Sequence, residues 1–121
     1  MLLSIMIPTY NERENIVVLL ESLCGLLVSL TGDYEVIVVD DASPDGTAAI
    51  VLEFAKKIPA VQLIRRENKR DLSAALSDGF DSAKGKYLIA MDADLQHDPT
   101  AVMRMLALAE DDALGLVVAT R

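Results

Sequence analysis

Cysteine is nearly absent from this 121-residue sequence, and basic residues are scarcer than acidic ones. Cys24 is the only cysteine, so no internal disulfide can form, and a reducing compartment is the simplest setting. We expect Cys24 to be a small core residue. Eleven Lys and Arg against nineteen Asp and Glu give a formal net charge of −8, which argues against non-specific nucleic-acid binding. The same excess favours carboxylates that hold a cation.

The sequence also lacks low-complexity segments and a long uninterrupted apolar run. The longest apolar stretch, at 16–30, is interrupted by Glu21 and is shorter than the roughly 20 residues that a bilayer requires. We interpret it as a buried helix, and a lipid-facing role is the alternative. The opening MLLSIMIP has no basic segment and too short an apolar run for a signal peptide, which predicts a cytoplasmic location. With 52% apolar residues, the chain is predicted to fold as one domain.

Short apolar runs alternate with longer segments of helical pattern along the chain. The runs are continuously apolar, as expected of parallel strands covered on both faces, and they lie at 2–8, 34–40, 60–65, 86–92 and 114–119. Helices are predicted between them, near 12–30, 44–57, 72–84 and 99–111. This alternation predicts an α/β fold with a mostly parallel sheet and helices on both faces.

Capping patterns mark the starts of three of these helices. Asn11 and Glu14 have the spacing of a capping box, and Ser43-Pro44 and Asp98-Pro99 each place a capping side chain before a proline. Each of these helices therefore begins directly after a strand end. The polar clusters at the strand ends should share one edge of the sheet, which is where such folds bind ligands.

The segment DADLQHD, after the fourth predicted strand, is the most unusual of these clusters. In an extended segment Asp92 and Asp94 point the same way, so two carboxylates converge on one point. A divalent cation relieves their repulsion, and hard oxygen ligands suit Mg²⁺ or Mn²⁺. Gln96 continues the alternation and could add an amide oxygen. The alternative is a solvated loop whose Asp98 caps a helix, and we interpret His97 as a surface or packing residue.

Two more polar clusters follow the first and second predicted strands. Asp40 and Asp41 face opposite directions, so they cannot form one metal site by themselves. One of them could accept hydrogen bonds from a base or ribose, while the other is expected to tie down the turn. Tyr10 could cover a base, and Glu12 could accept a hydrogen bond from it. The alternative is that all of these residues are turn residues or helix caps.

The chain resembles the family-2 glycosyltransferases of the GT-A fold, and most closely the dolichyl- or polyprenyl-phosphate sugar (mannose) synthases, in the segments IPTYNERENI, YEVIVVDDASPDGT, DGFDSAKGKYLIAMDADLQHDP and VVATR. The resemblance runs from end to end, and DADLQH together with DDxSxDGT is a specific combination. It implies that residues 1–121 form the Rossmann-like, nucleotide-sugar-binding half of the enzyme, with the acceptor-binding half absent from the chain. We therefore predict a sheet core of order 3-2-1-4, with residues 8–12, 39–41 and 92–96 at one edge.

The resemblance also implies an activity and its site residues. The enzyme would transfer a hexose from a GDP- or UDP-linked donor to dolichyl or polyprenyl phosphate with inversion, using Mg²⁺ or Mn²⁺, at the cytoplasmic face of a membrane. Asp92 and Asp94 match the metal-binding DXD positions, with Gln96 beside the metal. The positions that hold the nucleotide and phosphates are matched by Pro8, Tyr10, Glu12, Val39, Asp41, Ala93 and Arg121. An open sheet edge would allow a homodimer.

Other interpretations compete with this one. A receiver-like signalling module shares the length and the alternation, but it needs acidic residues after its first and third strands and a Lys after its fifth. A haloacid-dehalogenase-like phosphatase carries its DxD on the first strand, with a Thr or similar residue where this chain has Gln96. A non-catalytic nucleotide-binding remnant is the remaining alternative. Asp71 stands where the family often has glycine, and it could alter donor binding.

Overall fold

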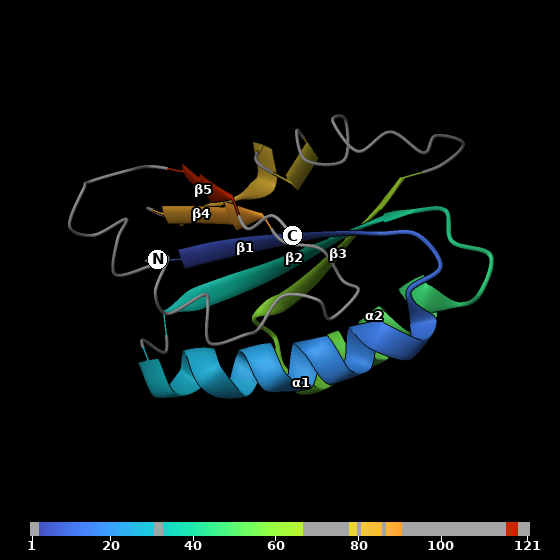
Figure 1. Ribbon diagram of the computed structural model, residues 1–121, viewed down its shortest axis with the longest axis horizontal. Coiled ribbons are helices and arrows are strands. Elements are labelled where there is room, and N and C mark those ends of the chain that lie inside the picture. Colours follow the sequence, from blue (N-terminus) through green and yellow to red (C-terminus); the bar gives the residue numbers. More distant parts are fainter. Residues whose placement is uncertain are drawn as a thin grey trace.

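The computed structural model describes residues 3–30, 33–66, 78–79, 81–85, 87–90 and 116–118. Its centre is a parallel sheet of five strands in the order β3-β2-β1-β4-β5 (Figure 1). The strands are β1 Leu3–Thr9, β2 Tyr34–Asp41, β3 Val61–Arg66, β4 Tyr87–Ala90 and β5 Leu116–Val118. The predicted α/β class and the predicted core order 3-2-1-4 are both confirmed.

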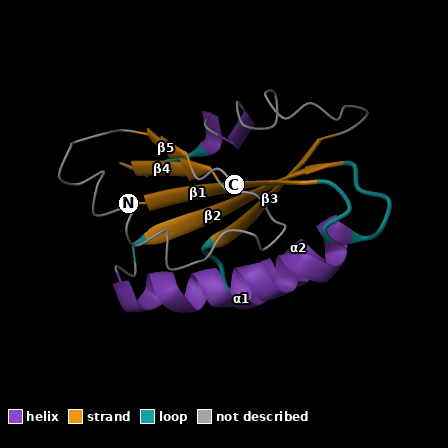
Figure 2. Cartoon of the chain, viewed as in Figure 1, coloured by secondary structure: helices purple, strands orange, loops and turns teal. Residues whose placement is uncertain are grey.

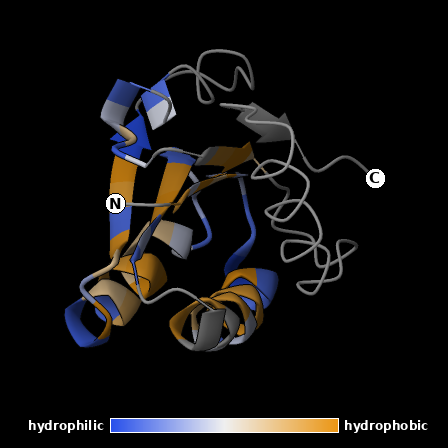
Figure 3. Cartoon of the chain, turned by 90° about the vertical axis from the view of Figure 1, so that its left-hand side faces the viewer, coloured by the Kyte–Doolittle hydropathy of each residue, from blue (hydrophilic) through white to orange (hydrophobic). Residues whose placement is uncertain are grey.

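Two helices, α1 (Arg13–Leu30) and α2 (Thr47–Lys57), cover one face of this sheet (Figure 2). Every second residue of the central strands points toward them, and Figure 3 shows hydrophobic residues gathered in this layer. The fully buried side chains include Ile5, Val36, Leu19 and Leu23. Because burying one such side chain contributes about 1.5–3 kcal/mol, this layer is the main source of stability.

Helix α1 confirms the interpretation of the apolar stretch at 16–30 as a buried helix. Its core-facing residues are Ile16, Leu19, Leu20, Leu23, Cys24 and Leu27. Cys24 is buried, as predicted for a core residue. Among the described residues, no helix is long and apolar enough to cross a membrane.

The opposite face of the sheet carries a smaller apolar cluster of Met6, Ile37, Val39 and Ala90. Residues 78–79 and 81–82 are helical and lie on this side of the sheet, away from α1 and α2 (Figure 2). A Cβ on Gly79 would lie 3.0 Å from Met6 Cγ and 3.4 Å from Val39 Cγ2, so this segment approaches the sheet closely. These four residues belong to the helix predicted near 72–84, while the helix predicted near 99–111 lies outside the described residues.

The predicted start of α2 is wrong, because the helix begins at Thr47 and not at Pro44. Ser43 does not cap it, since its Oγ donates to Asp40 Oδ1 (2.6 Å) and accepts from the backbone N–H of Asn11 (2.9 Å). Residue Gly46 adopts a left-handed conformation with φ 92°, which glycine tolerates without steric cost. The Thr47 N–H then donates to Asp45 Oδ1 (3.0 Å), so Asp45 closes the turn before the helix.

The predicted capping box at the start of α1 is also displaced by one residue. Asn11 has a left-handed φ of 55° and precedes the cap position. The carbonyl of Glu12 accepts the first helical hydrogen bonds, from the N–H groups of Asn15 (3.0 Å) and Ile16 (2.9 Å). Glu12 is therefore the N-cap residue of α1.

Candidate functional site

The polar segments after β1 and β2 meet at the carboxyl edge of the sheet. The two strands are parallel, and their register pairs Pro8 with Val39 and Thr9 with Asp40. The register of β2 with β3 places Arg66 beside Asp41. Residues 8–12 and 39–41 thus converge on one edge, as the sequence predicts, whereas residues 92–96 lie outside the described residues.

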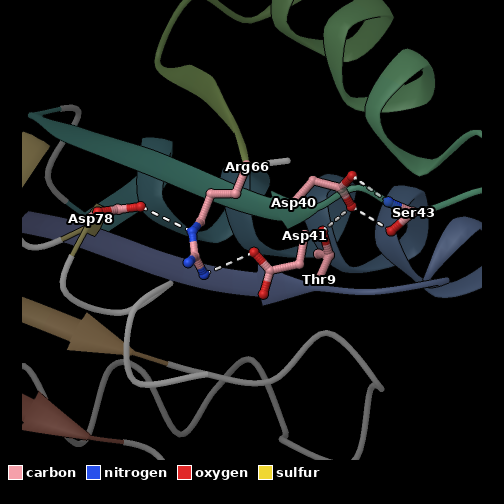
Figure 4. A network of polar contacts seen from close by, with 6 residues as sticks. All are labelled: Thr9, Asp40, Asp41, Ser43, Arg66 and Asp78. Carbon is pink, nitrogen blue, oxygen red and sulfur yellow. Dashed lines mark hydrogen bonds and ion pairs between the residues drawn. The ribbon is translucent and has the colours of Figure 1, made fainter. Parts of the chain in front are cut away.

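Asp40 is the member of the acidic pair that ties down the turn. Its carboxylate is fully buried and accepts three hydrogen bonds, from Thr9 Oγ1 (2.7 Å), Ser43 Oγ (2.6 Å) and Ser43 N–H (3.0 Å) (Figure 4). These bonds hold the chain through Ala42, whose φ of 54° is rare for a residue with a side chain. Asp40 therefore stabilises the turn after β2 and is not exposed to a ligand.

Asp41 points to the opposite face of the sheet, the side that also carries Val39. Its Oδ1 accepts a hydrogen bond from Arg66 Nη1 at 2.9 Å, and the two side chains are only 9% and 10% exposed. Arg66 Nε also contacts Asp78 Oδ2 at 3.0 Å, and Asp78 is 48% exposed (Figure 4). The guanidinium therefore lies between two carboxylates, one at the sheet edge and one on the segment that crosses this face.

Sequence reasoning missed Arg66, because the third predicted strand ended at residue 65. A basic residue at a strand end is usually solvated, so nothing in its own position suggests a buried ion pair. The signal lies in the alternation of side chains between the two faces of the sheet, compared across two paired strands. Once β2 and β3 are paired in parallel with this register, Arg66 and Asp41 are neighbours on the same face.

The structure also places the other predicted nucleotide-binding residues that it describes. Val39 is buried at 1% exposure, and Pro8 is half-buried beside it in β1. Tyr10 is half-buried and follows the end of β1. Glu12 Oε2 accepts from Asn15 Nδ2 (3.2 Å), which turns this carboxylate toward the start of α1.

The remaining predicted site residues lie outside the described residues: Asp92, Ala93, Asp94, Gln96 and Arg121. Within the described part of the chain, no group of three or more His, Cys, Asp and Glu side chains could hold a metal ion. The metal site predicted at Asp92 and Asp94 is thus an expectation that rests on the sequence.

Asp45 links the two loops behind the site. Its carboxylate accepts hydrogen bonds from the Thr47 hydroxyl, from Thr47 N–H (3.0 Å) and from Arg13 N–H (3.2 Å). Partial burial acts to raise the pKa of Asp45, but these hydrogen bonds outweigh it and hold the pKa below its ordinary value. Asp45 thereby joins the start of α1 to the start of α2.

Comparison with known proteins identifies relatives of this chain. Residues 4–121 match the family described as glycosyl transferase family 2. The chain is 43% identical over 106 residues to a dolichol-phosphate mannosyltransferase of Pyrococcus furiosus, covering 88% of this chain and 29% of the relative. It is 40% identical over 114 residues to the dolichol-phosphate mannosyltransferase of Saccharomyces cerevisiae, covering 93% of this chain and 43% of the relative.

The structure is also similar to that of a mannosyltransferase from Pyrobaculum calidifontis in complex with GDP-Man and Mn²⁺. The TM-score is 0.63 at 30% identity, and the match covers 76% of this chain and 27% of that one. The chain spans less than half the length of the curated relatives described above. A receiver-like module is not supported by any of these similarities. Since the family match covers nearly all of the sequence and the sheet has the order expected for it, the chain belongs to glycosyl transferase family 2.

Proposed function

We propose that this chain is the nucleotide-sugar-binding part of a glycosyltransferase that transfers a hexose to dolichyl or polyprenyl phosphate with inversion. The observation that carries the proposal is the convergence of residues 8–12 and 39–41 at the carboxyl edge of a parallel sheet, where this class of fold binds ligands. The names of the two dolichol-phosphate mannosyltransferases support the lipid-phosphate acceptor.

In this proposal the face that carries Val39 and Asp41 receives the nucleotide. Pro8 and Val39 form an apolar floor in neighbouring strands, and Tyr10 covers the base. Asp41 Oδ2 accepts a hydrogen bond from the base or ribose, while Oδ1 is held by Arg66. Glu12 adds a second acceptor from the loop after β1. The apolar floor excludes water, so the few polar groups can set the orientation of the nucleotide.

Asp92, Asp94 and Gln96 are the proposed ligands of a divalent metal, with Ala93 and Arg121 beside the phosphates. Mn²⁺ in the similar mannosyltransferase supports a divalent cation, and Mg²⁺ has the same preference for oxygen ligands. When bound, the metal supplies Lewis-acid stabilisation of the departing diphosphate. An anionic lipid phosphate can attack the anomeric carbon directly, so the proposal requires no nucleophile from the protein.

The donor we favour is GDP-linked, because the similar mannosyltransferase is in complex with GDP-Man. A UDP-linked donor is the second candidate. We also propose that the enzyme is a peripheral protein at the cytoplasmic face of a membrane, where it would meet a lipid-phosphate acceptor. We further propose a homodimer formed by strand pairing at an open edge of the sheet.

Isothermal titration calorimetry with GDP and with UDP, in Mn²⁺, tests the nucleotide site. Asp41→Asn should weaken the binding of GDP roughly tenfold, because it removes a charged acceptor from the base or ribose. Asp33→Asn is the matched control, since Asp33 is exposed just before β2, at the amino edge of the sheet. Binding that is unchanged by Asp41→Asn would contradict the assigned role of Asp41.

A radiolabelled sugar nucleotide with polyprenyl phosphate tests the transfer reaction. We expect this chain to bind the nucleotide but to form no lipid-linked sugar by itself, because sugar transfer also needs groups that position the acceptor and exclude water. A chain that binds neither GDP nor UDP with Mn²⁺ or Mg²⁺ would favour the non-catalytic remnant.

A further inference from the structure

We propose that Arg66 is a positioning residue for the nucleotide, acting through Asp41. The inference rests on the proposed function and adds a residue that the sequence pattern did not identify. Arg66 ends β3, and the parallel register places it beside Asp41 at the end of β2. Its guanidinium is the described group that directly fixes the Asp41 carboxylate.

The ion pair between Arg66 and Asp41 is largely shielded from water. The two side chains are 10% and 9% exposed, and Nη1 lies 2.9 Å from Oδ1. A charge-assisted hydrogen bond of this length is stronger and more directional than a neutral one. A carboxylate at the end of a strand could otherwise rotate about χ2, so this bond selects one orientation of Asp41 and directs Oδ2 toward a ligand.

Asp78 holds the other side of the same guanidinium. Its Oδ2 lies 3.0 Å from Arg66 Nε, so two different nitrogens of Arg66 contact two different carboxylates. The planar guanidinium is suited to this role, because its donors have fixed directions, whereas a lysine ammonium is a compact point charge. Two contacts through two different nitrogens leave Arg66 little freedom to turn away from Asp41.

The segment that carries Asp78 is seated close to the sheet. Gly79 follows Asp78 and lies so near Met6 and Val39 that a Cβ there would be 3.0 Å from Met6 Cγ. This close approach brings Asp78 within reach of Arg66. Residues 78–79, the guanidinium and Asp41 thus form one connected support beside Val39, which we place in the floor of the nucleotide site.

Arg66 also separates two carboxylates that would otherwise repel each other. Without it, Asp41 would be an unpaired charge with little access to water, on the same face of the sheet as Asp78. Asp41 would then be free to turn toward solvent. It would lose the orientation with which it accepts a hydrogen bond from the nucleotide.

A double-mutant cycle measured by calorimetry with GDP and Mn²⁺ tests this inference. Arg66→Gln should weaken binding roughly tenfold, as expected for loss of a hydrogen bond to a charged group. Asp41→Asn should weaken it by a similar factor. If Arg66 acts through Asp41, the double variant Asp41→Asn/Arg66→Gln should bind within about twofold of Asp41→Asn alone, because the two effects are coupled.

Three further variants separate positioning from loss of charge and from loss of fold. Arg65→Gln is the matched control: it removes the same charge from the exposed neighbouring position, and should change affinity by less than about twofold. Arg66→Lys keeps the charge and should bind GDP more weakly than wild type but more tightly than Arg66→Gln.

Asp78→Asn should reduce the affinity for GDP less than Arg66→Gln does, since Asp78 is about half exposed. Thermal unfolding of each variant identifies any that fails to fold, and Arg66→Lys and the double variant keep the test decisive in that case.

The possible outcomes distinguish this inference from the proposed function. If Arg66→Gln binds GDP as tightly as wild type does, the inference is overturned and the proposed function is not. If the losses of affinity of the two single variants multiply in the double variant, Arg66 acts on nucleotide binding independently of Asp41. That result also overturns the inference. A wild-type chain that binds neither GDP nor UDP would overturn the proposed function, and the inference with it.

Discussion

Asp40 and Asp41 are neighbours in sequence, but the alternation of a strand gives them different environments. Asp40 faces the helices and accepts hydrogen bonds from Thr9 and Ser43, whereas Asp41 faces the other side and pairs with Arg66. A buried carboxylate with three donors stabilises a turn, and a carboxylate held by one oxygen at a sheet edge can serve a ligand. The acidic pair therefore combines structural support with a candidate binding group.

Asp45→Ala should destabilise the protein by about 0.5–2 kcal/mol at neutral pH, because its carboxylate accepts hydrogen bonds from the first N–H groups of α1 and α2, much as a capping side chain does. The hydrogen bonds from Thr47 and Arg13 favour the ionised form of Asp45 and lower its pKa below the ordinary 3.8. A lowered folded-state pKa means that this stabilisation is fully present above pH 3.8 and is lost as the pH falls through the folded value.

Urea unfolding of wild type and Asp45→Ala, at several pH values, measures this contribution. The difference in unfolding free energy should be constant near neutral pH and should shrink in acid, below about pH 4. A difference that stays the same down to pH 2 would show that the charge of Asp45 contributes nothing to the interaction.

The sequence predicted part of this residue-scale arrangement. Alternation alone indicated that Asp40 and Asp41 face opposite ways and that one of them ties down the turn. It could not indicate which one, because that depends on which face α1 and α2 cover. Arg66 and Asp78 were not predicted, because their pairing with Asp41 depends on the register of β3 and on a segment that crosses the sheet.

At the scale of elements, a buried glutamate joins several strands at the amino edge of the sheet. Glu35 in β2 is 1% exposed, and its carboxylate accepts from Ser4 Oγ (2.6 Å), Gln62 Nε2 (2.7 Å) and the backbone N–H of Lys84 (2.6 Å). These partners come from β1, from β3 and from the residues that precede β4. Glu35 thus anchors the entry to β4, the strand that leads toward the DADLQHD segment.

Glu35→Ala should cost about 2–4 kcal/mol of unfolding free energy, because it leaves buried donors without an acceptor. Glu35→Gln should cost less, since its amide keeps one acceptor oxygen and Gln62 can turn its own amide to match. Chemical denaturation measures both variants. Equal stability of wild type and Glu35→Ala would show that this network contributes nothing to the fold.

Two glycines provide a matched pair of substitutions with opposite expected effects. A Cβ on Gly85 would lie 2.6 Å from both the backbone N and the Oγ of Ser4, whereas a Cβ on Gly25 in α1 meets nothing within 4 Å. Gly85→Ala should therefore destabilise the protein by about 1–3 kcal/mol, because the clash involves backbone. Gly25→Ala should stabilise it by up to about 1 kcal/mol through helix propensity.

Thermal melting of the two alanine variants checks this pair. Opposite shifts of the melting temperature are expected, downward for Gly85→Ala and upward for Gly25→Ala. A stable Gly85→Ala protein would mean that the residues before β4 do not lie against β1 as described.

The described elements could be predicted well, with the start of α2 as the exception. Continuous apolar runs identified the strands, because parallel strands buried on both faces need such residues. The start of α2 was misplaced by three residues, since Ser43 resembles a cap in sequence. In the structure its hydroxyl bonds to Asp40 and Asn11, so a tertiary contact overrides the local signal.

In the whole molecule, the sheet has the order that the resemblance to family-2 glycosyltransferases implies, and the alternation of strands and helices agrees with its parallel strands. That order brings the polar loops after β1 and β2 together, and it places β4 on the other side of β1. The meeting of these two loops at one edge of the sheet could therefore be predicted from the sequence, and their binding of a nucleotide remains a proposal. The metal side rests on the spacing of Asp92 and Asp94, which lie outside the described residues.

We propose above that one edge of this sheet binds a nucleoside diphosphate and a divalent metal together. If phosphate oxygens complete the shell of the metal, Mn²⁺ must raise the affinity for GDP by the same factor by which GDP raises the affinity for Mn²⁺. Asp94→Asn should abolish this coupling without unfolding the protein.

Calorimetric titration of GDP into the wild-type chain, with Mn²⁺ and with the metal removed by a chelator, is the most direct test. We expect GDP to bind at least about tenfold more tightly with Mn²⁺, and this difference to be lost in Asp94→Asn. Binding of GDP that is the same with and without Mn²⁺ would contradict a shared site for the nucleotide and the metal.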